Sequence, residues 1–295
     1  MIKKFLRIIY LNYVIPMFKL EKRYITKKFK NSLGYEIDFN KEPQSFNQKI
    51  QFRKVYDKNP LFTLCADKYK VREYVKNKIG EEYLIPIYLV TDKLTKEQWK
   101  SLPDSFVIKT NHGSGYVRIV YDKNKENSDL IIKEFNRYLK VKFGSKGQEY
   151  FYNKIKPKII IEKLLLNKNN EIPSDIKFHC FNKKGKIKML IQYDYDRFLD
   201  HKRKVYDENW NMLPFTIGHG FNKSQIHKPK NFEKMKEIAK KFSNDFDYVR
   251  VDLFNINGKI YFGELTFTHG CGFEKFDPPE YDFKIGELWC YERKK

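Results

Sequence analysis

The sequence predicts an α+β protein, with a mainly helical N-terminal region followed by a strand-rich remainder. Apolar residues recur at helical spacing early in the chain, whereas runs of β-branched and aromatic residues dominate from Lys158 to Asp196 and again after residue 247. An aromatic share of 17% over 295 residues favours a packed globular chain over disorder. No repeat or low-complexity linker is visible. We therefore expect a helical region over residues 1–100, packed on a second region over residues 101–295.

Three helices are expected with defined ends. The clearest runs from Asp67, a plausible N-cap, to Ile79. A second spans 127–143 and stops at Gly144, and a third spans 231–242.

Residues 1–20 are apolar but are interrupted by Arg7 and Asn12, so this segment is too short and too broken to span a bilayer. No small-residue cleavage site follows it. Two interpretations stay open. The segment lies on a membrane surface through its aromatic residues and cations, or it forms a helix docked on the body of the protein.

Composition limits the partners and the compartment. The four cysteines show no C-x-x-C spacing, which predicts a reduced compartment without structural zinc. The net charge is +22, but the cations are mostly lysine and no nucleic-acid-binding motif accompanies them, so nucleic acid is unlikely as a partner. The charge instead predicts a surface that attracts anionic lipid or an acidic polysaccharide. We expect a cytoplasmic protein, with peripheral attachment at the inner face of the membrane as an option.

A hairpin of acidic strands lies near the C-terminal end. Residues 250–254 and 261–266 are strand-like and are joined by Asn257-Gly258, a strong hairpin signal. Side chains alternate along a strand, so Arg250 and Asp252 share one face, as do Glu264 and Thr266. A cation, two carboxylates and a hydroxyl can therefore share one surface. Such oxygen ligands suit Mg²⁺ carried in with nucleotide phosphates, although a solvated hairpin would have the same pattern.

A second motif lies upstream. The strand-like run 106–110 carries Lys109 and enters the loop Gly113-Ser114-Gly115, after which 116–121 is expected to return as a strand. Such a loop can lay backbone N–H groups over phosphate oxygens while Lys109 supplies a point charge. The motif is not a Walker loop, and the protein-kinase order of loop and lysine is also absent.

The order of five features along the chain resembles that of the ATP-grasp superfamily. These features are the strand with Lys109, the glycine loop, the run 159–165, Arg-x-Asp at 250–252 and Glu-Leu-Thr at 264–266. Its fold has two α/β lobes with nucleotide between them. More specifically, the amino-acid sequence is similar to that of the TupA-like ATP-grasp family of bacterial cell-surface polysaccharide genes, over roughly residues 30–290. The sequence segments on which this similarity rests are 66–75, 79–86, 173–181 and 263–267.

The resemblance implies ATP and Mg²⁺ as cofactors. It implies nucleotide-binding roles for Lys109, Gly113, Ser114, Gly115, Glu162, Lys163, Leu165 and Lys177. It implies Asp252, Glu264 and Thr266 as metal ligands, and Arg250, Arg203 and Arg197 as catalytic residues. Two departures stand out. Thr266 takes the place of the family's Asn, and Thr268-His269-Gly270-Cys271-Gly272 replaces an expected Thr-Pro-Gly-Ser-Gly turn.

The implied function is ATP-dependent ligation of a carboxylate to an amine through an acyl phosphate, in capsule or teichuronopeptide-like polysaccharide biosynthesis. The substrates would be an acidic glycan and an amino acid. Three alternatives stay open. Asp194-Tyr195-Asp196 is the kind of motif by which glycosyltransferases hold a metal and a nucleotide sugar. The same nucleotide site would also serve a kinase, and the chain could be a non-catalytic adaptor for an acidic polymer.

Overall fold

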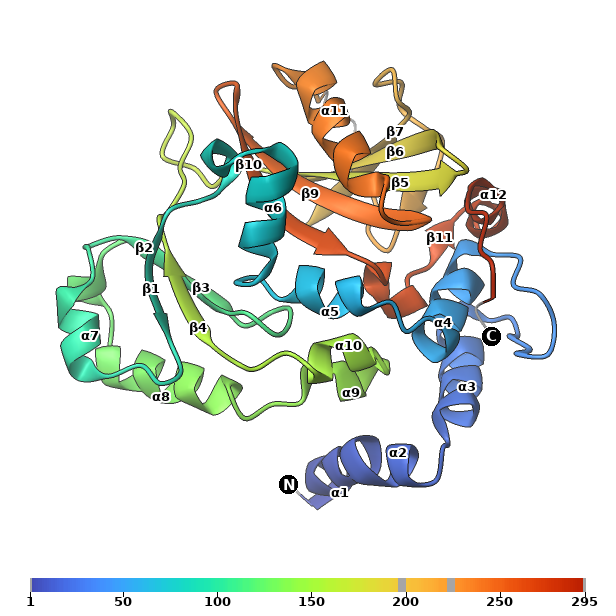
Figure 1. Ribbon diagram of the computed structural model, residues 1–295, viewed down its shortest axis with the longest axis horizontal. Coiled ribbons are helices and arrows are strands. Elements are labelled where there is room, and N and C mark those ends of the chain that lie inside the picture. Colours follow the sequence, from blue (N-terminus) through green and yellow to red (C-terminus); the bar gives the residue numbers. More distant parts are fainter. Residues whose placement is uncertain (1, 196–199, 222–225, 294–295) are drawn as a thin grey trace. The chain divides into compact units, whose positions relative to one another are not determined.

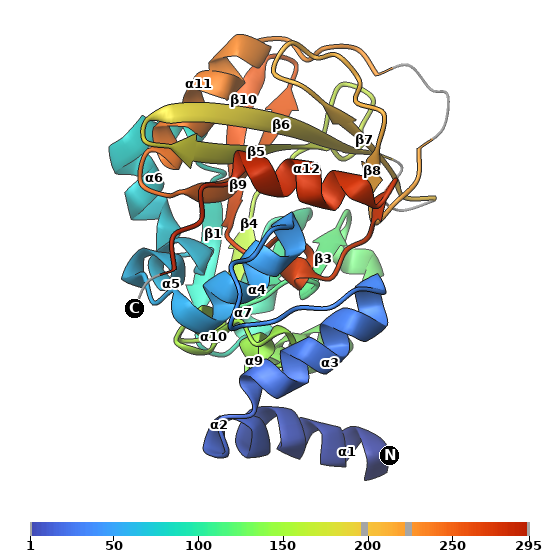
Figure 2. The same ribbon diagram turned by 90° about the vertical axis from the view of Figure 1, so that its right-hand side faces the viewer.

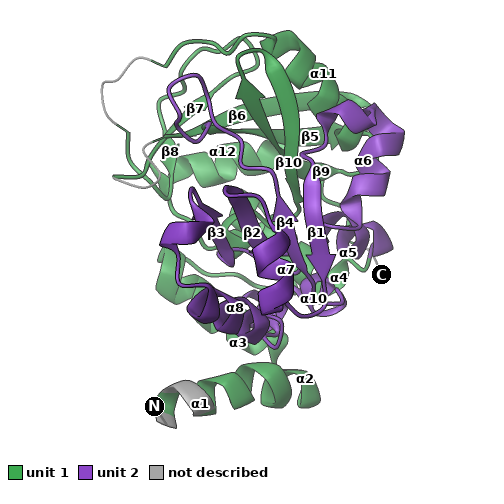
Figure 3. Ribbon diagram, turned by 90° about the vertical axis from the view of Figure 1, so that its left-hand side faces the viewer, with its two compact units in different colours: residues 1–58, 174–295 green, residues 59–173 purple. Residues whose placement is uncertain are grey.

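The computed structural model describes residues 2–195, 200–221 and 226–293, and it divides into two compact units. Unit 1 combines residues 1–58 with 174–295, and unit 2 comprises residues 59–173 (Figure 3). This division differs from the expected one at residue 100. The reason is that β1 (Ile87–Thr91), within the region expected to be helical, pairs with β4 (Ile159–Glu162). Residues 59–100 therefore belong with the strands that follow them.

Unit 2 is built on a four-stranded sheet with the strand order β1-β4-β2-β3 (Figure 1). Strands β2 (Phe106–Thr110) and β3 (Val117–Val120) form the expected antiparallel hairpin around the glycine loop. The helices of this unit are α5 (Pro60–Ala66), α6 (Val71–Ile79), α7 (Lys96–Ser101), α8 (Ser128–Tyr138), α9 (Phe143–Gly147) and α10 (Tyr150–Asn153).

The two faces of this sheet differ in character. Phe106 and Ile108 of β2, and Ile159 and Ile161 of β4, are buried in one apolar cluster with residues of α7 and α8. Because side chains alternate along a strand, Lys109 and Glu162 share the opposite face. The helical side of the sheet thus supplies the apolar burial, and the other side carries charge.

Unit 1 contains a five-stranded antiparallel sheet with the order β10-β9-β5-β6-β7 (Figure 2). Its strands are β5 (Asp175–Lys183), β6 (Lys186–Tyr195), β7 (Lys202–Tyr206), β9 (Tyr248–Ile256) and β10 (Lys259–Thr266), and β8 (Thr216–Ile217) pairs with β11 (Phe276–Asp277). The longer helices of the unit are α3 (Glu21–Leu33), α4 (Phe46–Tyr56), α11 (Phe232–Ser243) and α12 (Glu280–Leu288).

Helices cover both faces of this sheet. On one face Phe178 of β5 stacks on Phe232 of α11. On the other, Phe46 of α4 meets Phe181 of β5 and Tyr248 of β9 edge-on. The second face also carries the polar residues at positions 175, 177 and 179 of β5, which alternate with the apolar residues facing α11. The apolar packing of α4 therefore borders a row of buried polar groups.

Residues 2–17 are helical. α1 (Ile2–Ile9) continues through a π-helical turn (Tyr10–Val14) into α2 (Ile15–Met17). Leu11 and Ile15 are buried. No helix among the described residues has both the length and the apolar character needed to cross a bilayer.

The expected helices form with shifted ends. Asp67 accepts hydrogen bonds from the backbone N–H groups of Tyr69 and Lys70, and the helix begins four residues later at Val71. The expected helix over 127–143 is shorter, because α8 ends at Tyr138. A separate helix, α9, starts at Phe143 and continues through Gly144, where the expected helix was to stop. The third forms as α11, one residue later than expected.

Candidate active site

The acidic hairpin folds as its sequence predicts. Asn257 and Gly258 both have positive φ in the turn, and Glu264 pairs with Asp252 while Thr266 pairs with Arg250. A bulge at Gly263 shifts the register, and a Cβ there would meet the carbonyl oxygen of Asp252 at 3.0 Å. The two carboxylates therefore lie opposite each other on adjacent strands.

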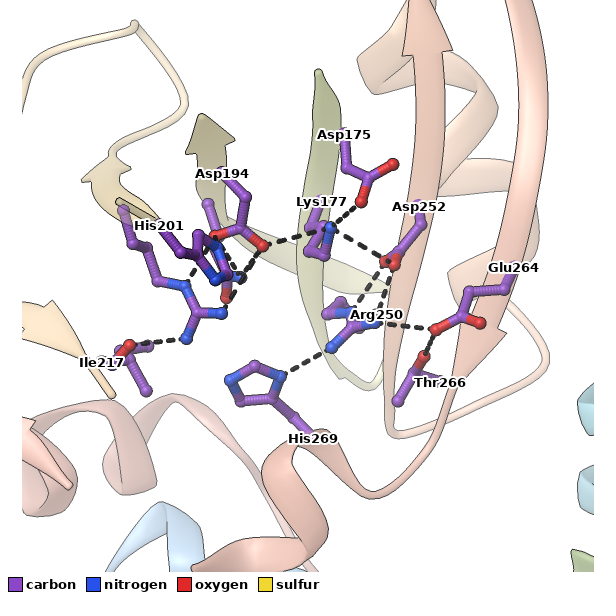
Figure 4. A network of polar contacts seen from close by, with 12 residues as sticks. Asp175, Lys177, Asp194, His201, Ile217, Arg250, Asp252, Glu264, Thr266 and His269 are labelled. Atoms are coloured by element: carbon purple, nitrogen blue, oxygen red, sulfur yellow. Dashed lines mark hydrogen bonds and ion pairs between the residues drawn. The ribbon is translucent and has the colours of Figure 1, made fainter. Parts of the chain in front are cut away.

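Arg250 lies between these carboxylates (Figure 4). Its Nε and Nη2 donate to the two oxygens of Asp252, each at 2.7 Å, and Nη2 also donates to Glu264 Oε1 at 2.9 Å. Burial acts to lower the pKa of Arg250, but the charge of Asp252 outweighs it and raises that pKa. A bidentate pair of this kind fixes the guanidinium plane.

Thr266 supports Glu264. Its hydroxyl donates to Glu264 Oε1 at 2.8 Å, so the same oxygen accepts from Arg250 and from Thr266. The hydroxyl proton thus points at the carboxylate, and Thr266 orients Glu264.

His269 accepts a hydrogen bond from the third guanidinium nitrogen of Arg250, Nη1. Nη1 donates to His269 Nδ1 at 2.7 Å, and arginine cannot accept a hydrogen bond, so Nδ1 carries no proton. Burial lowers the pKa of His269, which favours a neutral ring protonated at Nε2. That Nε2 lies 3.0 Å from Glu274 Oε2. The ring therefore links Arg250 to Glu274.

The contacts continue from Glu274 and close a loop. Arg203 Nη1 donates to Glu274 at 2.9 Å, and its Nε donates to Asp194 at 2.7 Å. Asp194 lies 3.3 Å from Lys177 Nζ, which is 3.8 Å from Asp252. We call these seven residues the charge ring: Lys177, Asp194, Arg203, Arg250, Asp252, His269 and Glu274. Their signs alternate except at neutral His269, so each charge has an opposite neighbour although the ring is largely buried.

Lys177 is the cation on β5. Its ammonium group lies 2.7 Å from Asp175, in addition to its contacts with Asp194 and Asp252. Burial acts to raise the pKa of Asp194, but Lys177 and Arg203 outweigh it and hold that pKa far below its usual range. The strand pairing brings these groups together, because Lys177 pairs with Asp252 on one side and Asp175 with Asp194 on the other.

The carboxylate pair fits a nucleotide-borne Mg²⁺. In the described part of the chain, no three His, Cys, Asp or Glu side chains are spaced to hold a metal on their own. Mg²⁺, however, is usually held by one or two carboxylates together with phosphates and water. Burial raises the pKa of Asp252 to about 6, although Arg250 and Lys177 oppose the shift. Asp252 and Glu264 thus have the chemistry of a partial site.

Lys109 and Glu162 form the polar pair of unit 2. The Lys109 ammonium group lies 2.5 Å from Glu162 Oε1, and both side chains are largely buried. Glu162 ends β4 and begins the segment for which the family resemblance implies nucleotide binding. The next residue, Lys163, donates its backbone N–H to Pro86 at 2.9 Å, and Leu165 lies just beyond β4.

The glycine loop has a fixed base. Asn111 donates to Asp67 at 2.9 Å and to the Lys156 carbonyl at 3.0 Å, and Lys68 Nζ donates to the Gly113 carbonyl at 2.7 Å. Gly113 packs so closely on Phe143 that a Cβ would clash at 2.8 Å. Gly115 has φ +82 and open space around its Cα, and Ser114 between the two glycines is exposed. The loop is held at its base and open at its tip.

Several of these residues were not predicted from the sequence. Arg203, expected to be a catalytic residue, has its Nε and Nη1 bonded to Asp194, Glu274 and the Ile217 carbonyl, and its catalytic role stays a prediction. Arg197 lies outside the described residues. Lys68 and Asp175 lie in the segments 66–75 and 173–181 that carry the family likeness, but they were assigned no role, and Glu274 lies in none of these segments. His269 was noted only as a departure from the expected turn. Register alone could have indicated Asp175.

The family model for the TupA-like ATP-grasp proteins matches residues 48–290. The chain belongs to this family. That membership gives the ATP-grasp fold, and it agrees with the helices, the antiparallel sheets and the two units seen here.

Solved structures that resemble the chain include ligases and a synthetase, by their descriptions. D-alanine–D-alanine ligase from Helicobacter pylori is 19% identical, with 77% of this chain and 60% of that chain covered and a TM-score of 0.41. The Bacillus anthracis D-alanine–D-alanine ligase complexed with ATP is 18% identical, with 69% and 55% covered and a TM-score of 0.41. N5-carboxyaminoimidazole ribonucleotide synthetase from Thermus thermophilus is 10% identical, with 74% and 51% covered and a TM-score of 0.41.

The chain thus spans between 51% and 60% of the length of these three structures. No curated protein matches its sequence significantly.

Proposed function

We propose that the chain is an ATP- and Mg²⁺-dependent carboxylate–amine ligase that forms an acyl phosphate. Its place would be the biosynthesis of a cell-surface polysaccharide, such as a capsule or a teichuronopeptide-like polymer. The observation that carries the proposal is the set of hydrogen bonds made by Arg250. Both oxygens of Asp252 fix the plane of its guanidinium group, which also donates to Glu264 on the paired strand. Family membership supports the nucleotide.

Asp252 and Glu264 would hold Mg²⁺, which when bound neutralises charge on the β- and γ-phosphates. Lys109 would exchange its bond with Glu162 for one with a phosphate, and the backbone of Gly113, Ser114 and Gly115 would cover the phosphates. Lys163 and Leu165 would border the adenine, and Lys177 would add positive charge beside Asp252.

Arg250 would act on the reacting groups. A substrate carboxylate oxygen attacks the γ-phosphorus, and the bond to the ADP oxygen breaks. The amine nitrogen then attacks the carbonyl carbon of the acyl phosphate, phosphate leaves with the electrons of the C–O bond, and the nitrogen loses a proton. A planar, permanently charged guanidinium can stabilise negative charge in both steps.

The substrate class follows from chemistry and resemblance. A carboxylate donor such as a uronic acid, with an amino acid supplying the amine, would suit a cationic protein with a net charge of +22. The polysaccharide setting rests on the likeness to the TupA-like family.

The alternatives have less support. A glycosyltransferase would use Asp194 and Asp196 for its metal, but the family match is to ATP-grasp proteins, and Asp196 lies outside the described residues. A kinase would use the same nucleotide groups with a hydroxyl acceptor. A non-catalytic adaptor would have no need for the guanidinium group of Arg250 to be fixed by Asp252 and Glu264.

Trapping of the intermediate tests the reaction type. Purified protein would be incubated with Mg²⁺-ATP, uronic-acid oligosaccharides or amino acids, and hydroxylamine. A hydroxamate that forms only with ATP and a carboxylate supports the ligase. ADP without hydroxamate, in the presence of a sugar hydroxyl acceptor, identifies a kinase. Release of UDP from a UDP-sugar identifies a glycosyltransferase, and no binding of Mg²⁺-ATP points to the adaptor.

A further inference from the structure

The first helical segment presents a continuous apolar stripe to solvent. Leu6, Tyr10, Tyr13 and Met17 are spaced by four, three and four residues, and they are exposed at 57%, 40%, 59% and 77%. That spacing places them on one face of a helix. Phe18, at 62% exposure, extends the stripe beyond the helix.

The opposite face of this segment is fixed to unit 1. Leu11 is 7% exposed and Ile15 is fully buried. At the border of the stripe, the ring of Tyr10, which is 40% exposed, lies 6.5 Å from that of Tyr24 in α3. The segment is therefore held along one side, which leaves the apolar stripe facing outward; α1, α2 and α3 follow one another in Figure 2.

Cations are concentrated in the same part of the chain as the stripe. Residues 1–35 contain nine Lys and Arg but a single acidic residue, Glu21. Lys3, Arg7, Lys19, Lys22, Arg23 and Lys27 are all exposed. An apolar stripe with aromatic residues and flanking cations is the combination that lies in the interface of an anionic bilayer, with the cations at the level of the headgroups.

We propose that residues 3–27 dock on the surface of a membrane that contains anionic lipid. A second copy of the chain fits this surface poorly, because a two-fold contact would place the same cations opposite each other. Nucleic acid would match the cations but would leave the apolar stripe in water. This docking does not depend on the proposed chemistry.

Vesicle co-sedimentation of the full chain tests the proposal. We expect binding to vesicles of equal parts phosphatidylcholine and phosphatidylglycerol to be at least about tenfold stronger than to phosphatidylcholine alone, and to weaken as salt rises. Met17→Glu should reduce binding about tenfold, because it places a carboxylate in the stripe. Lys19→Gln combined with Lys27→Gln should reduce binding to the anionic vesicles and its dependence on salt.

The matched control is Leu130→Glu on α8, where an apolar side chain is 64% exposed outside the segment. It should bind vesicles like the wild type, and circular dichroism should be the same for all variants. Failure to bind anionic vesicles at low salt, equal binding to neutral vesicles, or an equal loss in Leu130→Glu would overturn the proposal. Self-association in solution that Met17→Glu abolishes would also overturn it, and would identify a second copy as the occupant.

Discussion

Arg250 donates one hydrogen bond to His269, at 2.7 Å from Nη1 to Nδ1, while its other two nitrogens hold Asp252. Nη2 also donates to Glu264, so three groups fix the plane of a guanidinium that is proposed to follow the phosphoryl group. His269 stands where a proline was expected from the family resemblance, and its ring contacts the proposed catalytic arginine.

We predict that His269→Ala lowers kcat about 10- to 100-fold with little change in KM for ATP, since Arg250 loses one of its supports and misplacement of a reacting group is costly. His269→Asn retains an acceptor near the position of Nδ1 and should recover part of the rate. Steady-state ADP formation measures both values, and thermal melts report on folding. A wild-type kcat in His269→Ala would show that Asp252 and Glu264 suffice to hold Arg250.

Arg250→Lys should reduce kcat more than substrate binding, by about 100-fold or more, because a point charge cannot reproduce the planar fork. Burst and steady-state kinetics of ADP release separate the chemical step from binding. Equal losses in kcat and in substrate affinity would place Arg250 in ground-state binding instead.

Lys109→Ala should weaken ATP binding by about tenfold or more in calorimetry, since the ammonium group would no longer meet a phosphate. The control is Lys125→Ala, because the Lys125 side chain is 84% exposed and lies 3.7 Å from Asp122. Lys123 is unsuitable as a control, because it donates to the Lys100 and Leu102 carbonyls and so helps to hold the chain after β3. Equal ATP affinity in wild type and Lys109→Ala would contradict the nucleotide assignment.

Local patterns predicted much of this molecule. Asn257-Gly258 defined the hairpin, and period-two alternation placed Arg250, Asp252, Glu264 and Thr266 together, because both signals are short-range. The division into units could not be read this way, since it depends on β1 pairing with a strand some seventy residues later. The hydrogen bond from Arg203 to Glu274 could not be predicted either, because the two residues are 71 positions apart and share no motif.

Asp252→Asn and Glu264→Gln should each weaken the Mg²⁺ dependence of ATP binding, and the double variant should fall short of the sum of the two single effects, because both carboxylates would serve one ion. Calorimetry of ATP with varied Mg²⁺ gives the coupling. Asp175→Asn is a matched control, as it removes a nearby charge from β5. If Asp194→Asn abolished activity while the Asp252 and Glu264 variants were tolerated, the glycosyltransferase alternative would gain support.

Glu274 should make the protein sensitive to acid. Burial acts to raise its pKa, but His269 and Arg203 outweigh this and hold the pKa well below its usual range. The pKa is therefore lower in the folded state than in the unfolded state. Its contribution to stability is complete above the unfolded value of about 4.3, and it is lost as pH falls through the folded pKa.

Glu274→Gln should accordingly destabilise the protein by about 2 kcal/mol near pH 7, because the carboxylate loses its ion pair with Arg203 and its contact with the neutral His269 ring. The difference from wild type should shrink as the pH falls below about 4. Urea unfolding across a pH series measures it. Glu237→Gln, which alters an exposed pair with Lys234 on α11, should change stability little at any pH. A constant difference down to the lowest pH would mean that Glu274 stabilises the fold by packing, and that its charge contributes nothing to the ring.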